Sequence, residues 1–290
     1  MKFGLAFASS VGVEAEAALE IARLADGLGF DSIWGGEHVV RPLRIASPYP
    51  YTEDGEVPGD HETPVPDPLI WLAFVASAAP SLRLGTCILV LPQRNPLVLA
   101  KELATLDRLT GGRVELGIGV GWLREEFDAL GIPWARRGAR TDECIAAMRA
   151  LWAGPGAEFH GEFFDFEPVT CSPRPVGAAI PITVGGDSTA AVRRAARLAD
   201  GYFPGAGDPE VLAGLIAQLR EALDAEGRPS EAVAVSANLS AQMADPLAGA
   251  ERMAALGVAR AMVPAFSFTG PGGLDRLAEF GEKVVARLSD

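Results

Sequence analysis

Val114–Trp122 has the sequence VELGIGVGW, which begins as an apolar strand and ends in alternating glycines. A glycine carries no side chain, so a strand that ends in glycines lets its backbone approach another group closely. We expect that group to be a phosphate, and the alternative is a tight strand-to-helix turn that binds nothing. A Rossmann dinucleotide-binding loop is excluded, because Trp122 stands where that fingerprint requires its last glycine.

Strand and helix patterns alternate along the whole chain, and this alternation predicts the fold class. The predicted strands are residues 2–8, 31–35, 83–91, 113–118, 181–184, 200–203, 232–238 and 260–266. The predicted helices are residues 13–28, 67–79, 97–109, 141–152, 189–199, 209–225, 246–256 and 273–288. Eight β–α units predict an α/β protein, a (β/α)8 TIM barrel in which residues 1–290 form a single domain with its chemistry at the C-terminal strand ends. A doubly wound open sheet is the structural alternative.

Three segments between these elements are longer than ordinary connections, and we expect them to lie as insertions over the C-terminal face of the barrel. They are residues 39–66, 122–140 and 157–179. The first is rich in proline and has no periodicity, which suits a lid, because long loops inside a compact domain are usually functional. The second contains a short predicted helix near residues 124–130. The third carries several phenylalanines, which could form a short hairpin that covers another part of the protein.

The composition excludes several kinds of partner. The net charge is −13, so nucleic acid and anionic membranes are poor partners. Cys87, Cys144 and Cys171 are widely spaced and form no CxxC pair, so neither a disulfide framework nor a metal site is expected. The apolar runs are shorter than the ~18 residues of a membrane helix. The N-terminus has no signal-peptide pattern, so we expect a cytoplasmic protein.

Two predicted strand ends carry side chains suited to catalysis or to anion binding. Glu37 and His38 follow the second strand. A lone histidine is more often structural, but the strand-end position favours acid–base chemistry for His38. Gly185–Ser188 precedes a helix, so it can bind an anion or simply cap that helix. Trp122 either packs in the core or covers a bound ring, and one or two arginines of residues 124–140 could serve an anionic cofactor.

Several short motifs stand in a fixed order along the first 205 residues. They are Phe30–Trp34 with Glu37-His38, Gly85-Thr86, Asn95-Pro96, Gly111–Arg113, Gly117–Trp122, Ala135–Gly138, Pro181–Gly186 and Ala199–Tyr202. This ordered set resembles the bacterial luciferase-like flavin oxidoreductases, and more narrowly their actinobacterial branch that uses the deazaflavin coenzyme F420. Relatives that use FMN share the same motifs.

The resemblance implies a barrel whose mouth binds the cofactor ring, usually in a homodimer. It implies a non-proline cis peptide between Cys87 and Ile88, behind the ring. His38 matches the family's active-site histidine, and Glu37 stands where relatives often have aspartate, so both are the expected catalytic residues. The implied cofactor-binding residues, which include the phosphate site, are Cys87, Ile88, Gly119, Val120, Gly121, Trp122, Gly185, Gly186, Asp187 and Ser188.

The resemblance also implies an activity. The protein would be an oxidoreductase that transfers a hydride between coenzyme F420 and a small organic substrate. The first alternative is an FMN-dependent luciferase-like monooxygenase, which uses O2 and receives reduced flavin from a separate reductase. The second alternative belongs to another class, a non-catalytic flavin- or deazaflavin-binding barrel. We expect residues 39–66 and 157–179 to shape the substrate pocket, and their sequences identify no one substrate.

Overall fold

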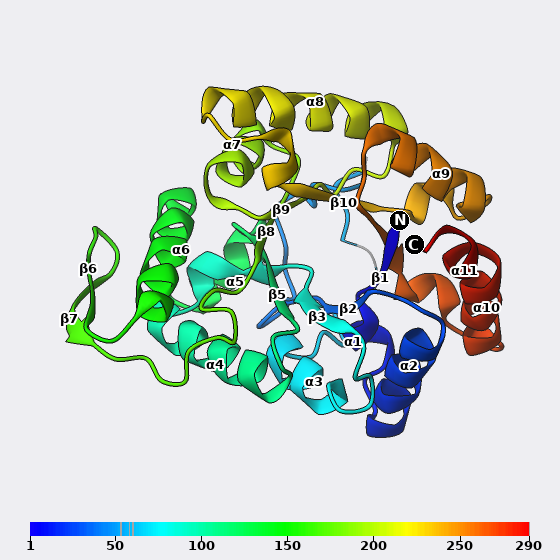
Figure 1. Ribbon diagram of the computed structural model, residues 1–290, viewed down its shortest axis with the longest axis horizontal. Coiled ribbons are helices and arrows are strands. Elements are labelled where there is room, and N and C mark those ends of the chain that lie inside the picture. The colour runs from blue at the N-terminus through cyan, green and yellow to red at the C-terminus, as the bar shows by residue number, and fades with distance from the viewer. Residues whose placement is uncertain (53, 58, 60, 290) are drawn as a thin grey trace.

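The computed structural model describes residues 1–52, 54–57, 59 and 61–289. Within these residues, nine strands form one sheet in the order β3-β2-β1-β11-β10-β9-β8-β5-β4, and a further pairing of β3 with β5 closes it into a barrel. The strands are β1 (Lys2–Ala6), β2 (Ser32–Gly35), β3 (Arg83–Thr86), β4 (Leu89–Val90), β5 (Val114–Gly119), β8 (Ile182–Gly185), β9 (Gly201–Phe203), β10 (Ala234–Asn238) and β11 (Arg260–Pro264). Figure 1 shows the helices arranged around this barrel. The predicted (β/α)8 barrel is therefore confirmed.

The third strand of the barrel is interrupted, which explains why nine strands build an eight-stranded barrel. β3 pairs in parallel with β2 and β5, and β4 continues the same path beside β5. Between them, the Cys87–Ile88 peptide bond is cis. The cis peptide that the family resemblance implied at this position is confirmed.

The barrel is covered by helices that alternate with the strands. They are α2 (Ala15–Gly27), α3 (Pro68–Val75), α4 (Pro96–Leu109), α6 (Arg137–Ala153), α7 (Thr189–Leu198), α8 (Pro209–Ala225), α9 (Pro246–Leu256) and α10 (Gly273–Phe280). Shorter pieces are α1 (Ala8–Val11), α5 (Arg124–Ala129), α11 (Ala286–Leu288), the 3-10 turns η1 (Leu91–Gln93), η2 (Ser230–Ala232), η3 (Ser240–Gln242) and η4 (Ala265–Phe268), and the π-helical turn η5 (Gly281–Val285). In the described part of the chain, no helix is long and apolar enough to cross a bilayer.

The starts of several covering helices are encoded locally by an Asp-Pro or Asn-Pro pair. At Asp67, Asn95 and Asp208, the side chain accepts hydrogen bonds from amides of the first helical turn. The proline that follows each of them has no N–H to satisfy, and its ring already has a helical φ. These caps explain why the sequence predicts these helix starts well.

Two boundaries differ from the prediction because single residues adopt a left-handed backbone. Phe7 has a φ of 57°, which ends β1 at Ala6 and lets α1 begin at Ala8, so the predicted strand 2–8 is too long. Arg136 has a φ of 61° and is followed directly by α6, four residues earlier than the predicted start at residue 141. The second insertion is correspondingly shorter.

The third insertion forms the predicted hairpin, but the hairpin packs against the outer side of α6 and not over the barrel mouth. β6 (Ala157–His160) pairs with β7 (Asp165–Val169), and Figure 1 shows this hairpin outside α6, away from the barrel mouth. Glu143 on α6 fixes the turn there, because its carboxylate accepts hydrogen bonds from the amides of residues 162–164. The expectation that residues 157–179 lie over the C-terminal face is therefore corrected. Arg136, which directly precedes α6, also pairs with Glu162, so the hairpin runs along the outer side of α6 back to the start of that helix and does not cover the barrel mouth.

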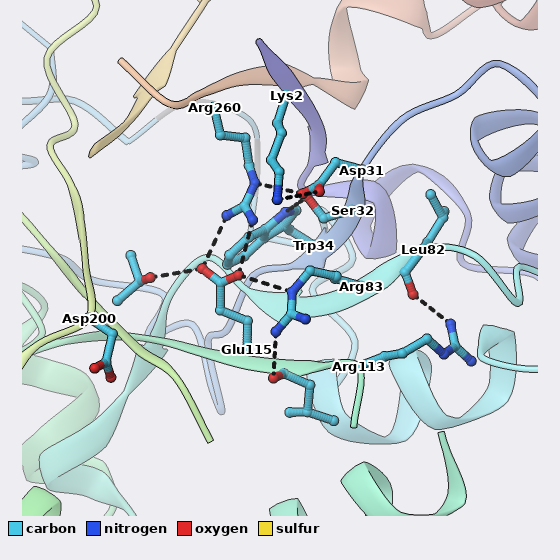
Figure 2. Close-up of polar contacts among 12 residues, drawn as sticks. Lys2, Asp31, Ser32, Trp34, Leu82, Arg83, Arg113, Glu115, Asp200 and Arg260 are labelled. Atoms are coloured by element: carbon cyan, nitrogen blue, oxygen red, sulfur yellow. Dashed lines mark hydrogen bonds and ion pairs between the residues drawn. The ribbon is translucent and has the colours of Figure 1, made fainter. Parts of the chain in front are cut away.

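The lower half of the barrel interior, toward the N-terminal strand ends, holds a buried ionic network (Figure 2). Arg260 on β11 donates to both carboxylate oxygens of Glu115 on β5, at 3.1 and 3.2 Å. Arg260 Nε also donates to Asp31 at 2.9 Å, and Thr183 donates to Glu115 at 2.9 Å. The guanidinium lies 5.2 Å from the centre of the Trp34 ring, which separates this network from the barrel mouth.

Candidate active site

The mouth of the barrel has an apolar floor, made by residues at the C-terminal ends of several strands. Ala6, Trp34, Cys87, Phe203 and Met262 form a cluster of their own, with Phe7 packed against it. Phe7 in turn stacks on Phe266, with ring centres 5.1 Å apart. Gly36 completes the surface, since a Cβ there would stand 3.2 Å from the Phe7 ring. An apolar surface in a barrel mouth fits one face of a flavin or deazaflavin ring.

His38 follows the C-terminal end of β2, two residues after Gly36, and is held by a buried carboxylate. Its Nδ1 lies 3.1 Å from Oε2 of Glu126, which comes from α5. The other oxygen of Glu126 accepts hydrogen bonds from the Val39 amide at 2.6 Å and from the Val40 amide at 3.3 Å. The His38 side chain remains 22% exposed, whereas that of Glu126 is 1% exposed. Glu126 therefore fixes the backbone after β2 together with the imidazole.

The charge state of Glu126 determines which nitrogen of His38 is available. Burial alone would raise the pKa of Glu126, but hydrogen bonds from His38 and from the Val39 amide outweigh burial and lower it. An ionised Glu126 accepts hydrogen bonds, so the Nδ1 of His38 must carry the proton that it donates. This leaves Nε2 of His38 as the nitrogen that can exchange a proton in the barrel mouth.

Glu37, the other expected catalytic residue, is placed in a structural ion pair. Its Oε2 accepts a hydrogen bond from the Val90 amide at 2.6 Å, and its Oε1 accepts from Arg94 Nε at 2.9 Å. Arg94 also binds Asp67, the N-cap of α3, at 2.8 Å. Both oxygens of Glu37 are thus occupied by the segment that follows the cis peptide. The structure brings His38 to the barrel mouth and gives Glu37 contacts that fix the backbone around it.

The glycines at the ends of β5 and β8 are also required by packing inside the protein. A Cβ at Gly119 would stand 2.6 Å from Ile88 Cδ1, and a Cβ at Gly185 would stand 2.9 Å from Ile88 Cγ2. Gly121 has a φ of +78°, and a Cβ there would stand 2.7 Å from both Phe127 and Val90. The ends of β5 and β8 therefore lack side chains partly because Ile88 of the cis peptide fills the space between them.

The segment after β8 combines the two readings that its sequence left open. Ser188 caps α7, because its Oγ accepts a hydrogen bond from the Ala191 amide at 3.2 Å. The Gly186 amide is taken by the Phe203 carbonyl at 3.2 Å, and Asp187 accepts from the Gly205 amide at 2.6 Å. The capping role of Ser188 is confirmed. The backbone amides of the first turn of α7 retain the capacity to bind an anion.

An arginine from the second insertion lies beside the end of β5. Arg137 Nε donates to the Gly121 carbonyl at 3.2 Å, and its guanidinium lies 3.6 Å from the centre of the Trp134 ring. Burial lowers the pKa of Arg137, but a guanidinium stays charged at neutral pH. A cation next to the glycines of β5 and the N-terminus of α7 fits a phosphate between them.

The first insertion crosses the barrel mouth, as expected of a lid. Its backbone amides at Ala46 and Ser47 donate to Glu125 on α5, at 2.8 and 3.0 Å. Tyr49 then packs edge-on against Trp122, with ring centres 5.1 Å apart. Further on, the Tyr51 ring covers Gly205 beyond β9, leaving no space for a Cβ there. The lid is therefore anchored from the end of β2 to the end of β9.

Several residues that build the site were not identified from the sequence. Glu126 and Arg94 each contact a residue that is distant in the chain, 88 positions away for Glu126 and His38 and 57 for Arg94 and Glu37. The available signal was weak. Glu126 is one of two adjacent acids just after the glycines of β5, and Arg94 is a single cation in the loop that follows the third strand.

Comparison with known proteins agrees with this architecture. Residues 1–283 match the Luciferase-like monooxygenase family, so the chain belongs to that family and is a luciferase-like oxidoreductase. An uncharacterized protein of Mycobacterium tuberculosis, Rv0940c, is 38% identical over 212 residues, which are 73% of each chain. The FMNH(2)-dependent dimethylsulfone monooxygenase of Pseudomonas putida is 36% identical over 137 residues, which are 46% of this chain and 38% of that enzyme.

Solved structures give the same fold over the full length. The monooxygenase RslO1 from Streptomyces bottropensis superposes with a TM-score of 0.78 and 25% identity, covering 100% of both chains. An F420-dependent secondary alcohol dehydrogenase, solved with an F420–acetone adduct, superposes with a TM-score of 0.77 and 19% identity over 98% of both chains. These likenesses support a flavin or deazaflavin cofactor and leave the choice between the two open.

Proposed function

We propose that this protein binds coenzyme F420 in the barrel mouth and transfers a hydride between it and a small organic substrate. The observation that carries the proposal is His38, which follows the end of β2 and is oriented by the buried Glu126. The cofactor would supply the hydride-transfer chemistry, and the protein would bind and orient it. The fold of the F420-dependent alcohol dehydrogenase is compatible with this cofactor.

Each group of residues in the site would have its own role. The floor, which includes Cys87, and the neighbouring Ile88 would support one face of the ring. Gly119–Trp122, together with Arg137, would hold the phosphate from one side, and Gly185–Ser188 with the N-terminus of α7 would hold it from the other. His38 Nε2 would give a proton to, or take one from, the substrate oxygen or carbon next to the reacting centre. The lid would exclude water from the closed mouth.

Glu37 is proposed as a positioning residue and not as an acid or base. Its carboxylate is committed to the Val90 amide and to Arg94, so it acts by holding the segment after the cis peptide in place. The substitution Glu37→Gln would keep the size and shape of the side chain but lose the ion pair with Arg94. A role in stability and cofactor affinity follows from these contacts.

The first prediction concerns cofactor choice. Titration of the protein with F420 should quench the cofactor's fluorescence with a saturable curve, and isothermal calorimetry should give a lower Kd for F420 than for FMN. His160→Ala is the matched control and should not change either Kd, since His160 ends β6 in the hairpin outside α6 and pairs with Asp165 there. Tight FMN binding with no F420 binding would overturn the choice of cofactor.

One observation favours FMN as a second candidate. The dimethylsulfone monooxygenase that uses reduced FMN is 36% identical to this chain over the matched segment. In that case the protein would act as a monooxygenase with O2, and a separate reductase would supply the reduced flavin. The calorimetric comparison of the two cofactors distinguishes the candidates directly. Binding of either cofactor without turnover on any screened alcohol, ketone or enone would instead support a non-catalytic barrel.

The protein is proposed to be a homodimer that pairs through α3. This helix is apolar on all sides, and its outer residues Ile70 and Phe74 are 74% and 48% exposed in one chain. A helix that is apolar all round is normally buried. Val98 on the neighbouring α4 extends the same surface.

The second prediction tests this interface. Ile70→Glu combined with Phe74→Glu should convert a dimer to a monomer in size-exclusion chromatography with light scattering, because two charges would have to be buried without partners. Val211→Glu on α8 is the control, since it places the same charge at an exposed apolar position on the opposite side of the barrel. A wild-type monomer, or a dimer that survives the double change, would contradict the proposal.

A further inference from the structure

A groove of about 450 Å³ lies on the outer side of the barrel, between α6 and α7. It is lined by Asp142, Thr189, Ala190, Arg193, Arg194 and Arg197. Thr189 and Ala190 form the first turn of α7, so the groove begins immediately after Gly185–Ser188. It is therefore adjacent to the proposed phosphate site.

The groove carries an excess of positive charge. Among the described residues that line it, Asp142 is the one carboxylate, and it is shared by Arg194 at 2.5 Å and by Arg197. Arg193 has no hydrogen-bond or ion-pair partner within the part of the chain that the structure describes. Three arginines thus face one aspartate, in a protein whose net charge is −13. Such a local reversal of sign is suited to an anionic ligand.

A continuous series of contacts joins this groove to the end of β5. Arg137 binds the Gly121 carbonyl at 3.2 Å, and the next residue, Gly138, accepts a hydrogen bond from Arg194 at 3.1 Å. Arg194 then shares Asp142 with Arg197. A ligand that extends beyond a phosphate at Gly121 along this path would therefore meet Arg193, Arg194 and Arg197 on α7.

We propose that the groove binds a chain of carboxylates attached to the phosphate end of the cofactor. The proposal rests on the proposed function and deepens it, because it concerns the same ligand. The F420 molecule continues past its phosphate into an oligoglutamyl tail, whereas FMN ends at its phosphate. Arg193 and Arg197, on the exposed side of α7, would pair with the tail carboxylates, and Arg194 and Asp142 would hold the groove open. The groove would then select F420 over FMN by charge.

The test measures affinity rather than activity. Calorimetric Kd values are compared for F420 with a long oligoglutamyl tail, F420 with a single glutamate, and FMN. In the wild-type protein the Kd of the long-tailed form should be lower than that of the single-glutamate form by about 10-fold or more. Hydrogen bonds to charged groups contribute substantially to the binding free energy. This preference should shrink at high salt, because exposed ion pairs are screened.

Two variants locate the effect. Arg193→Gln with Arg197→Gln should abolish the preference for the long tail and leave the Kd of the single-glutamate form within about twofold of wild type. Arg252→Gln with Arg287→Gln, on α9 and α11, removes the same charge elsewhere and should preserve the preference. Tail-independent F420 binding in the wild type, or equal losses for both F420 forms in the groove variant, would overturn this inference alone. Absence of any F420 binding would overturn the proposed function.

Discussion

Replacing His38 by alanine is expected to lower turnover about 10²- to 10⁴-fold, the usual contribution of a general acid or base. The Kd of the cofactor should change little, because the floor and the phosphate contacts remain. Steady-state kinetics on any substrate found by screening, together with calorimetry, separate these two quantities. His160→Ala, on β6 of the outer hairpin, is the control for loss of an imidazole outside the site. Unchanged turnover in His38→Ala would remove His38 from the mechanism.

A companion change distinguishes chemistry from positioning. Glu126→Gln keeps the shape of the side chain but loses its charge, so it should lower kcat about 10- to 100-fold, the value of a hydrogen bond to a charged group. Added imidazole should partly restore His38→Ala and leave Glu126→Gln unchanged, because only the first variant lacks the ring itself. If the Glu126→Gln enzyme had wild-type kcat and an unaltered pH profile, the hydrogen bond between His38 and Glu126 would have no part in turnover.

Replacing Arg260 by methionine is expected to reduce the free energy of unfolding by about 3–5 kcal/mol, because it leaves a buried charge without its partner. Arg260 and Glu115 are 8% and 7% exposed, so water does not compensate the lost bonds. Glu115 would lose two hydrogen bonds, and Asp31 would lose one (Figure 2). Equilibrium unfolding in urea at neutral pH measures the loss.

The control for Arg260→Met is Lys283→Met, which breaks an exposed pair with Glu279 and should cost less than about 1 kcal/mol. The double variant Arg260→Met with Glu115→Leu should recover part of the loss, since an apolar pair leaves no unpaired charge. A loss below 1 kcal/mol for Arg260→Met would show that the network does not support the barrel.

The same network gives the protein an acid-sensitive component of stability. Burial alone would raise the pKa of Asp31, but Arg260 and Lys2 outweigh it and lower the pKa. A carboxyl group whose pKa is lower in the folded state stabilises the fold above its unfolded-state pKa, and this contribution disappears as the pH falls through its folded-state pKa. In Arg260→Met this component should be smaller, so the variant and the wild type should differ less in acid than at neutral pH.

Much of the fold followed from local signals in the sequence. The Asp-Pro and Asn-Pro pairs start helices because the cap and the proline act within one turn. The alternation of apolar strands and amphipathic helices predicted the barrel, and the position of His38 directly after a strand predicted its place at the mouth. The hairpin of residues 157–179 was predicted as an element, but its location was not, because that location depends on Glu143 of α6.

The sequence by itself determined the barrel, its direction and the strand ends that carry chemistry, because strand period, helix caps and glycine turns act over a few residues. Only the tertiary structure decided how those ends are used. Glu126 reaches His38, Ile88 fills the spaces of Gly119 and Gly185, and Glu37 is taken by Arg94. These pairings join residues that are distant in the chain, so they depend on barrel closure, and no local pattern encodes them.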